Sequence, residues 1–193
     1  DIAGGTSTPV YLILGMEHLF FGIDHVLFVL LLLYLVRGCR NLVKAVTSFT
    51  VAHSITLGLS AFNILAVSQA PIEAMIALSI VLLAAEVLRG EDSLIHRKPW
   101  LITFLFGLLH GLGFAGALAE IGLPQDSVAM ALFLFNAGIE IGQLAIIAVA
   151  LALTFIAARI GLKFVQRVIA LPIYLIGGIA VYWFIERSLQ VLV

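Results

Sequence analysis

The sequence predicts an all-α polytopic membrane protein, a bundle of six transmembrane helices with both termini on the outer side. Three observations support this fold class. Of 193 residues, 63% are hydrophobic and only 11% are charged, which is more apolar surface than a water-soluble domain of this length can bury. The apolar residues form continuous runs near the length of about 20 residues that a spanning helix needs, without the alternation of membrane strands. Basic residues gather in every second loop.

The first three spans are expected over residues 10–36, 42–66 and 72–89. The first follows a polar N-terminal tail, residues 1–9, and ends at an Arg-Gly pair, which is a common helix-ending signal. The third is short, because Pro71 precedes it and the charged run RGED follows it. The chain starts at Asp1 without a methionine, so we expect a mature or trimmed product from which a preceding segment has been removed.

The last three spans are expected over residues 99–121, 128–158 and 165–190. Pro124 separates the fourth span from the fifth, and the polar stretch 159–163 separates the fifth from the sixth. The fifth is long enough to tilt or to extend past the bilayer. Residues 10–193 therefore form one six-helix transmembrane domain.

The distribution of basic residues predicts the orientation. Only Arg187 lies outside the loops after the first, third and fifth spans, and those loops hold Arg37, Arg40, Lys44, Arg89, Arg97, Lys98, Arg159, Lys163 and Arg167. By the positive-inside rule, these loops are cytoplasmic and both termini are outside, which suggests a bacterial inner (plasma) membrane with periplasmic termini. The lipid bilayer is the expected partner, and the net charge of −1 argues against nucleic acid.

Four of the five histidines lie within the expected spans, accompanied by two carboxylates; they are His18, His25, His53, His110, Asp24 and Glu140. Ionisable groups in hydrocarbon are costly and are usually retained for a function. Three of the histidines and Glu140 lie near the middle of four different spans, so four helices bring such a group to the same depth. This agreement predicts one shared site near the bilayer midplane.

The first span carries the densest motif, EHLFFGIDH over residues 17–25. His18 and His25 are seven residues apart, as are Glu17 and Asp24, and seven residues make about two helical turns. On a continuous helix, each pair lies along one side. The motif therefore predicts a ladder of imidazoles and carboxylates that climbs from the outer half of the membrane to the midplane.

Polar and small residues surround the other expected ligands. Two glycines, Gly107 and Gly111, are spaced for close helix packing and place His110 at a helix interface. Hydroxyl and amide side chains suit support of a metal ion's ligands. The predicted supporting residues are Glu17, Thr50, Thr56, Asn136 and Gln143.

The donor types indicate a metal site. Imidazole nitrogens with carboxylate oxygens suit Zn²⁺, Ni²⁺, Co²⁺, Cu²⁺ or Fe²⁺. The single cysteine and three methionines argue against a Cu⁺ site. The expected ligands of a divalent ion (nickel, cobalt or zinc) are His18, Asp24, His25, His53, His110 and Glu140.

These motifs resemble those of the HupE/UreJ membrane proteins, hydrogenase and urease accessory proteins regarded as nickel or cobalt permeases. The first string is His18-x-x-x-Gly22-x-Asp24-His25. Three further strings are similar to the second branch of that family: Phe49-Thr50-x-x-His53-Ser54-x-Thr56, Gly107-Leu108-x-His110-Gly111-Leu112-Gly113-Phe114 and Phe135-Asn136-x-Gly138-x-Glu140-x-Gly142-Gln143. The resemblance implies a six-helix, metal-related membrane protein.

Three functions remain open at this level. A divalent-cation permease would pass an ion along the ladder from Glu17 and His18 to Asp24 and His25. An intramembrane metal-dependent hydrolase would bind zinc through three histidines and a carboxylate, with Glu140 or Asp24 as general base. A bis-histidine haem protein ranks lowest, because buried carboxylates suit a harder ion. The resemblance places the permease first, although the inner half of the bundle has few polar groups for an exit.

Overall fold

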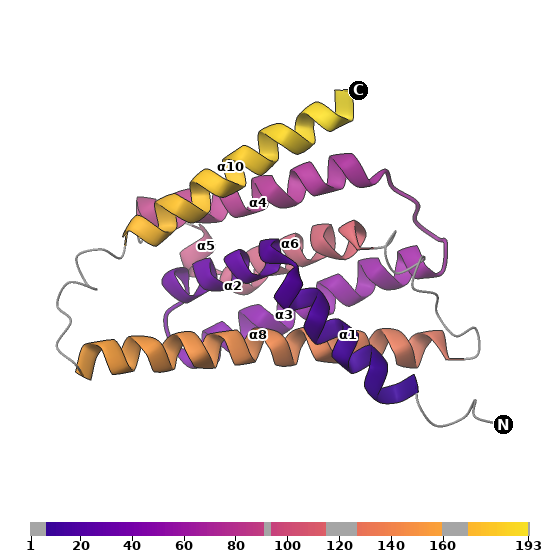
Figure 1. Cartoon of the computed structure of the whole chain (residues 1–193), viewed down its shortest axis with the longest axis horizontal. Coiled ribbons are helices and arrows are strands. Elements are labelled where there is room, and N and C mark those ends of the chain that lie inside the picture. Colours follow the sequence, from indigo (N-terminus) through magenta and orange to yellow (C-terminus); the bar gives the residue numbers. More distant parts are fainter. Residues whose placement is uncertain (1–6, 91–93, 115–126, 160–169, 193) are drawn as a thin grey trace.

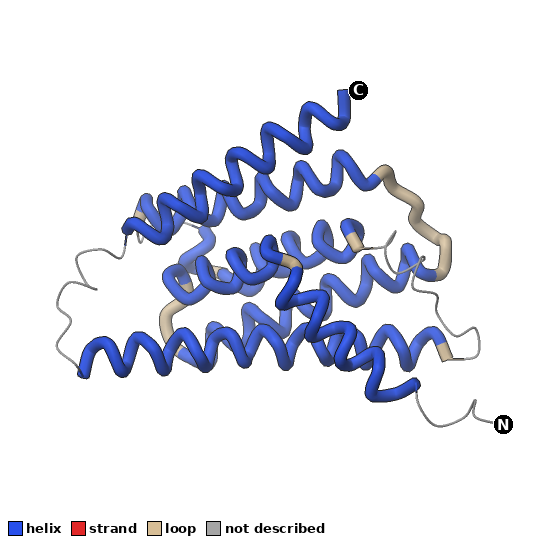
Figure 2. The backbone as a smooth tube through the Cα atoms, viewed as in Figure 1, coloured by secondary structure: helices blue, strands red, loops and turns tan. Residues whose placement is uncertain are grey.

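A computed structural model describes residues 7–90, 94–114, 127–159 and 170–192, and all regular structure in these ranges is α-helical (Figures 1 and 2). The all-α prediction is confirmed for this part of the chain. The helices are α1 (Ser7–Phe21), α2 (Ile23–Leu35), α3 (Cys39–Ala61), α4 (Gln69–Arg89), α5 (Leu94–Arg97), α6 (Pro99–Gly113), α8 (Val128–Arg159) and α10 (Ala170–Leu192).

The described helices account for four or five of the six expected spans. Helices α3, α4, α8 and α10 are each long and apolar enough to cross a membrane, and the bent pair α1–α2 adds a fifth if it forms one span. Helix α6 is apolar but has 15 residues. The rest of the expected fourth span, 115–121, lies outside the described residues, as do residues 1–6 of the expected tail; residues 7–9 belong to α1.

The helices form a bundle in which α3 lies between α6 and α8, and α10 lies along α4 (Figure 1). Helices α2, α4 and α8 end on the left in Figure 1, whereas α3 ends on the right. Apart from the end of α10 near Arg187, the described helix ends that carry basic residues therefore lie at one end of the bundle, as the charge pattern predicts. Large side chains from three helices fill the core, among them Phe28, Phe49 and Leu83, each 0% exposed.

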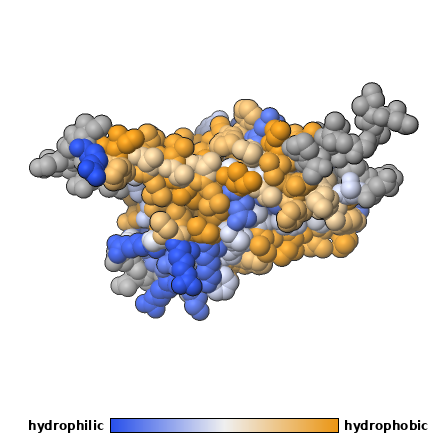
Figure 3. All heavy atoms as spheres, turned by 90° about the horizontal axis from the view of Figure 1, so that it is seen from below, coloured by the Kyte–Doolittle hydropathy of each residue, from blue (hydrophilic) through white to orange (hydrophobic). Residues whose placement is uncertain are grey.

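The surface is suited to a bilayer. Much of the face in Figure 3 is hydrophobic, and hydrophilic residues gather in one region. On α8 and α10, large apolar side chains point outward: Phe133 is 68% exposed, Leu153 is 62% and Leu175 is 59%. Because an aqueous protein would not leave such faces uncovered, the chain is an integral membrane protein.

The expected continuous helix over 10–36 is wrong, because the chain bends by 74° between α1 and α2 at Gly22. The Gly22 amide still donates to the His18 carbonyl at 2.9 Å. A Cβ on Gly22 would lie 2.6 Å from that carbonyl oxygen and 2.9 Å from His25 Nδ1, so only glycine fits here. Beyond the bend, α2 packs against α4 while α1 remains on α8.

Candidate metal centre

The bend at Gly22 brings two histidines of the first motif into contact. The His18 and His25 rings have centroids 4.8 Å apart in a T-shaped arrangement, instead of lying one above the other on a straight helix. His53 comes from α3, with its ring centroid 6.2 Å from that of His18 and 6.1 Å from that of His25. One ligand atom from each of the three side chains lies within 4.8 Å of the others. We call these residues the histidine triad.

His110 approaches the triad from α6. Its ring centroid is 4.9 Å from that of His25, and its side chain is 1% exposed. It is not a member of the closely spaced group of three found among the described residues. The four intramembrane histidines predicted to meet therefore do come together, with His110 adjacent to the other three.

The α8 amide Asn136 fixes the tautomer of His53. Asn136 Nδ2 donates to the Leu132 carbonyl at 2.8 Å, so its Oδ1 faces His53 Nδ1 at 3.0 Å as an acceptor. The proton of a neutral His53 must then lie on Nδ1, which leaves a lone pair on Nε2 that a metal ion could accept. Asn136 thus holds His53 in the tautomer that a metal ligand would need, which is the role expected of a supporting residue.

A serine that the sequence analysis did not select orients His110. Ser79 Oγ donates to the Ile76 carbonyl at 2.7 Å, so it accepts from His110 Nε2, 3.4 Å away. The lone pair of a neutral His110 then lies on Nδ1. Ser79 is 2% exposed and comes from α4, a helix in which the sequence analysis selected no site residue.

Several ring nitrogens in this cluster are buried without a partner. Within the described part of the chain, no hydrogen bond satisfies His18 Nε2, His25 Nδ1 and Nε2, His53 Nε2 or His110 Nδ1. A buried polar atom without a partner costs about 1–3 kcal/mol. Several such atoms on adjacent imidazoles are costly, and a metal ion would satisfy the lone pairs among them.

Aromatic side chains enclose the cluster. The Phe114 ring lies against His18 with centroids 3.8 Å apart and 45° between the planes, and Phe135 stacks on Phe114 at 5.1 Å with 9° between the planes. Phe49 contacts His25, His53 and His110, with centroids at 6.0, 6.1 and 5.1 Å. An apolar shell of this kind limits water and strengthens electrostatic interactions within the site.

The predicted carboxylates lie apart from the triad. Asp24 pairs with Arg187, with Oδ2 2.9 Å from Nη1. Glu140 Oε1 accepts a hydrogen bond from Thr47 Oγ1 at 2.6 Å, and Glu17 is exposed. Among the described residues, no carboxylate joins the group of three histidines. The sequence analysis placed these acidic groups by depth and spacing, which do not reveal the side of the helix that faces the cluster.

The two threonines beside His53 differ in their contacts. Thr50 Oγ1 donates to Gln143 Oε1 or to the Val46 carbonyl, each at 3.2 Å, and so links α3 to α8. Within the described part of the chain, Thr56 Oγ1 bonds to α3 alone, to backbone carbonyls three and four residues earlier, at 3.4 and 3.3 Å. Thr50 and Gln143 therefore support the helix interface near the site, whereas no bond from Thr56 to a histidine ring is present.

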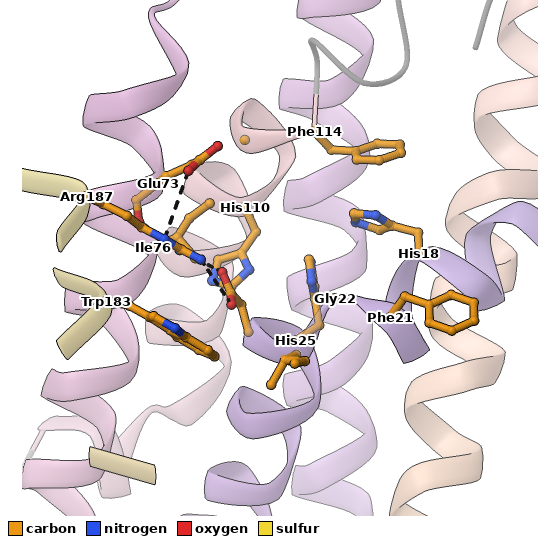
Figure 4. A pocket seen from close by; sticks show the side chains of 13 residues that line it. His18, Phe21, Gly22, His25, Glu73, Ile76, His110, Phe114, Trp183 and Arg187 are labelled. Atoms are coloured by element: carbon orange, nitrogen blue, oxygen red, sulfur yellow. Dashed lines mark hydrogen bonds and ion pairs between the residues drawn. The ribbon is translucent and has the colours of Figure 1, made fainter. Parts of the chain in front are cut away.

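A cavity of about 400 Å³ lies beside the cluster (Figure 4). Three histidines line it together with acidic, basic and aromatic groups: His18, His25, His110, Asp24, Glu73, Trp183 and Arg187. Arg187 comes from α10 and was not among the predicted site residues. One signal was available, since it is the only basic residue outside the three basic loops.

The donor set fits a borderline divalent transition metal. Three imidazoles with free lone pairs, without cysteine or a triad carboxylate, suit Ni²⁺, Co²⁺ or Zn²⁺ better than Mg²⁺ or Ca²⁺. The fold and this cluster define a polytopic α-helical membrane protein with a candidate metal centre in its core.

A comparison with protein families matches residues 3–187 to the family described as HupE / UreJ protein, and the chain belongs to this family. The resemblance noted in the four motifs is thereby confirmed. The family is associated with nickel and cobalt transport. Comparisons with curated proteins and with solved structures find no match.

Replacing Asn136 by leucine should weaken metal binding. The substitution leaves the Nδ1 proton of His53 without its acceptor, so the ring is no longer held with the Nε2 lone pair available for a metal ion. Loss of such a supporting hydrogen bond typically lowers metal affinity about 10–100-fold. Equilibrium dialysis of Ni²⁺ with purified protein would measure the affinity. Asn41→Leu is the control, because Asn41 is exposed near the start of α3 and donates to the Arg37 carbonyl at 3.2 Å, outside the cluster. Equal affinities of the two variants would contradict the assigned role.

Proposed function

We propose that this protein is a permease for a divalent transition-metal ion of the nickel or cobalt type, located in a bacterial inner membrane with both termini on the outer side. One observation carries the proposal: adjacent buried imidazoles with unpartnered nitrogens line or adjoin a cavity between the helices of a membrane bundle. In this proposal the ion is the transported substrate. His18, His25 and His53 hold it, with His110 beside them.

The cavity supports entry of a cation. Its wall holds two carboxylates, Asp24 and Glu73, against one guanidinium, so its net charge favours cations. The imidazoles of His18, His25 and His110 offer nitrogen ligands along the same wall. His53 does not line the cavity and lies deeper, at the α3–α8 interface. An ion that enters would therefore pass from histidines that share the cavity to one fixed by Asn136.

Polar contacts along the α3–α8 interface support a continuation toward the other end of the bundle. From His53 and Asn136, the interface proceeds to Thr50 with Gln143, and to Thr47 with Glu140. Thr47 also lines a second cavity of about 720 Å³ near the start of α3. In this proposal Glu140 serves as a further station for the ion beside the triad, where Thr47 contacts it.

The two alternatives receive less support. A hydrolase needs a carboxylate beside the metal-bound water, whereas Asp24 is paired with Arg187 and Glu140 with Thr47. A bis-histidine haem needs two imidazoles on opposite faces of a macrocycle. The rings of His18 and His25 instead touch each other directly. Transport therefore accounts best for the cluster.

Ni²⁺ uptake into proteoliposomes tests the proposal. The unaltered protein should accumulate Ni²⁺ down an imposed gradient, and His25→Ala should reduce the initial rate to that of empty vesicles, because His25 contributes two of the unpartnered nitrogens. His96→Ala is the matched control, since His96 lies on α5 outside the cluster. Protein that binds Ni²⁺ stoichiometrically but carries no flux would exclude transport and restore the enzyme alternative.

A further inference from the structure

Arg187 carries a permanent positive charge on the wall of a cavity suited to cations. Its Nη1 lies 2.9 Å from Asp24 Oδ2 and its Nη2 lies 3.5 Å from Asp24 Oδ1. The guanidinium carbon also lies 5.3 Å from the centre of the Trp183 ring. The two ionic side chains are only 19% and 20% exposed, so they are not freely solvated surface groups.

A second acidic residue lies on the other side of the same guanidinium. Glu73 Oε2 is 4.0 Å from Arg187 Nε, and the Glu73 carbonyl accepts from Nη1 at 3.2 Å. Figure 4 shows Arg187 between Glu73 and Trp183, near His110 and His25. The arginine thus has one close carboxylate partner and one looser partner, whose side chain is 44% exposed.

Anchoring of α10 explains only part of this arrangement. An ion pair joining α10 to α2 and α4 could serve that purpose anywhere along the helices. Here its acidic member immediately precedes His25, and both members line the cavity that His18 and His110 line. While Arg187 holds Asp24, the carboxylate that directly precedes His25 is neutralised. The arginine therefore competes directly with any cation that approaches the histidines.

We propose that Arg187 is a displaceable internal cation that controls the access of Asp24 to the metal ion. Without metal, the guanidinium occupies the Asp24 carboxylate. When a divalent ion enters the cavity, Asp24 exchanges the guanidinium for the ion, and Arg187 moves its contact to the Glu73 carboxylate. This inference rests on metal binding by the proposed permease and adds a residue that sets the strength of that binding. Because the ion gains Asp24 only by breaking its contact with Arg187, the net strength of metal binding is reduced. The ion can then leave the site again.

Ni²⁺ affinity measured in detergent, by calorimetry or equilibrium dialysis, tests the exchange without a flux assay. Arg187→Gln should tighten Ni²⁺ binding about tenfold or more, because the ion no longer has to break the Arg187–Asp24 contact, and a hydrogen bond between charged groups is worth at least that factor. Arg159→Gln is the charge-matched control at the far end of α8, and it should leave the affinity unchanged. Weaker or unaltered binding in Arg187→Gln would overturn the proposal.

A double-mutant cycle separates exchange from simple charge repulsion. Asp24→Asn should weaken Ni²⁺ binding, and Arg187→Gln added to it should give no further gain, because the arginine acts through that carboxylate. A tenfold gain that persists in the Asp24→Asn background would overturn the exchange. If Arg187→Gln does not fold, Arg187→Lys keeps the charge but cannot contact both Asp24 oxygens through two nitrogens, and it should tighten binding severalfold; unchanged affinity would again overturn the proposal.

The outcomes also separate this inference from the proposed function. Binding with the predicted cycle but without flux in vesicles would exclude the permease and retain the Arg187 exchange. Flux by the unaltered protein with a purely additive cycle would retain the permease and exclude the exchange. Absence of Ni²⁺ binding by the unaltered protein would exclude both.

Discussion

Replacing His53 by alanine is expected to abolish stoichiometric metal in the purified protein and to lower Ni²⁺ affinity by at least about a hundredfold. A hundredfold is the upper end of the loss seen when only a residue that orients a metal ligand is removed. His53 contributes its Nε2 to the triad, and its ring is held by Asn136 at 3.0 Å. The truncation removes a ligand from a 0%-exposed position that water does not easily fill. Elemental analysis together with dialysis against a graded Ni²⁺ series would measure both quantities.

A parallel substitution of His110 distinguishes a three-histidine centre from a four-histidine centre. His110 contacts His25 but is not in the close group of three, so His110→Ala should retain one ion per chain at reduced affinity. Loss of the ion in both variants would instead require four ligands. Full metal content in His53→Ala would place the ion elsewhere in the protein. His96→Ala, outside the cluster, should match the unaltered protein.

The elements that composition controls could be predicted from the sequence. Apolar runs gave the helices, and the agreement in depth of His25, His53 and His110 correctly indicated that they meet. Packing glycines were also informative, because a Cβ on Gly107 or Gly111 would run into the α3 backbone, as their spacing predicts. These properties depend on one position at a time or on local spacing, which a single sequence contains.

The features that the sequence did not reveal depend on tertiary contacts. Gly22 has the same local sequence signal as a glycine that permits close packing, so nothing nearby predicted a 74° bend. Arg187 meets Asp24 across 163 residues, and Glu140 meets Thr47 across 93. Position within a span fixes depth but not helix rotation, which decides whether a buried carboxylate faces the histidines or a neighbouring helix.

Substitution of Gly111 should damage both the fold and the metal centre. A Cβ at this position would collide with the His53 carbonyl and Thr56 Oγ1, so α6 must move away from α3. Overpacking of this kind costs about 1–3 kcal/mol for Gly111→Ala, and Gly111→Leu should cost more. His110 directly precedes Gly111, and the added Cβ would strike the backbone of His53. The same displacement should therefore separate the imidazoles of His110 and His53 and weaken Ni²⁺ binding.

Gly58→Ala provides the matched control on α3. Among the described residues, no atom outside the adjoining backbone of α3 lies within 4 Å of a Cβ built there. Helical alanine is also favoured over glycine by about 0.5–1 kcal/mol. The free energy of unfolding in mixed micelles should therefore fall for Gly111→Ala and be equal or higher for Gly58→Ala. If Gly111→Ala were as stable as the unaltered protein and kept its Ni²⁺ affinity, α3 and α6 could not approach as closely as described. The site depends on that approach, since each of these two helices supplies one of its histidines.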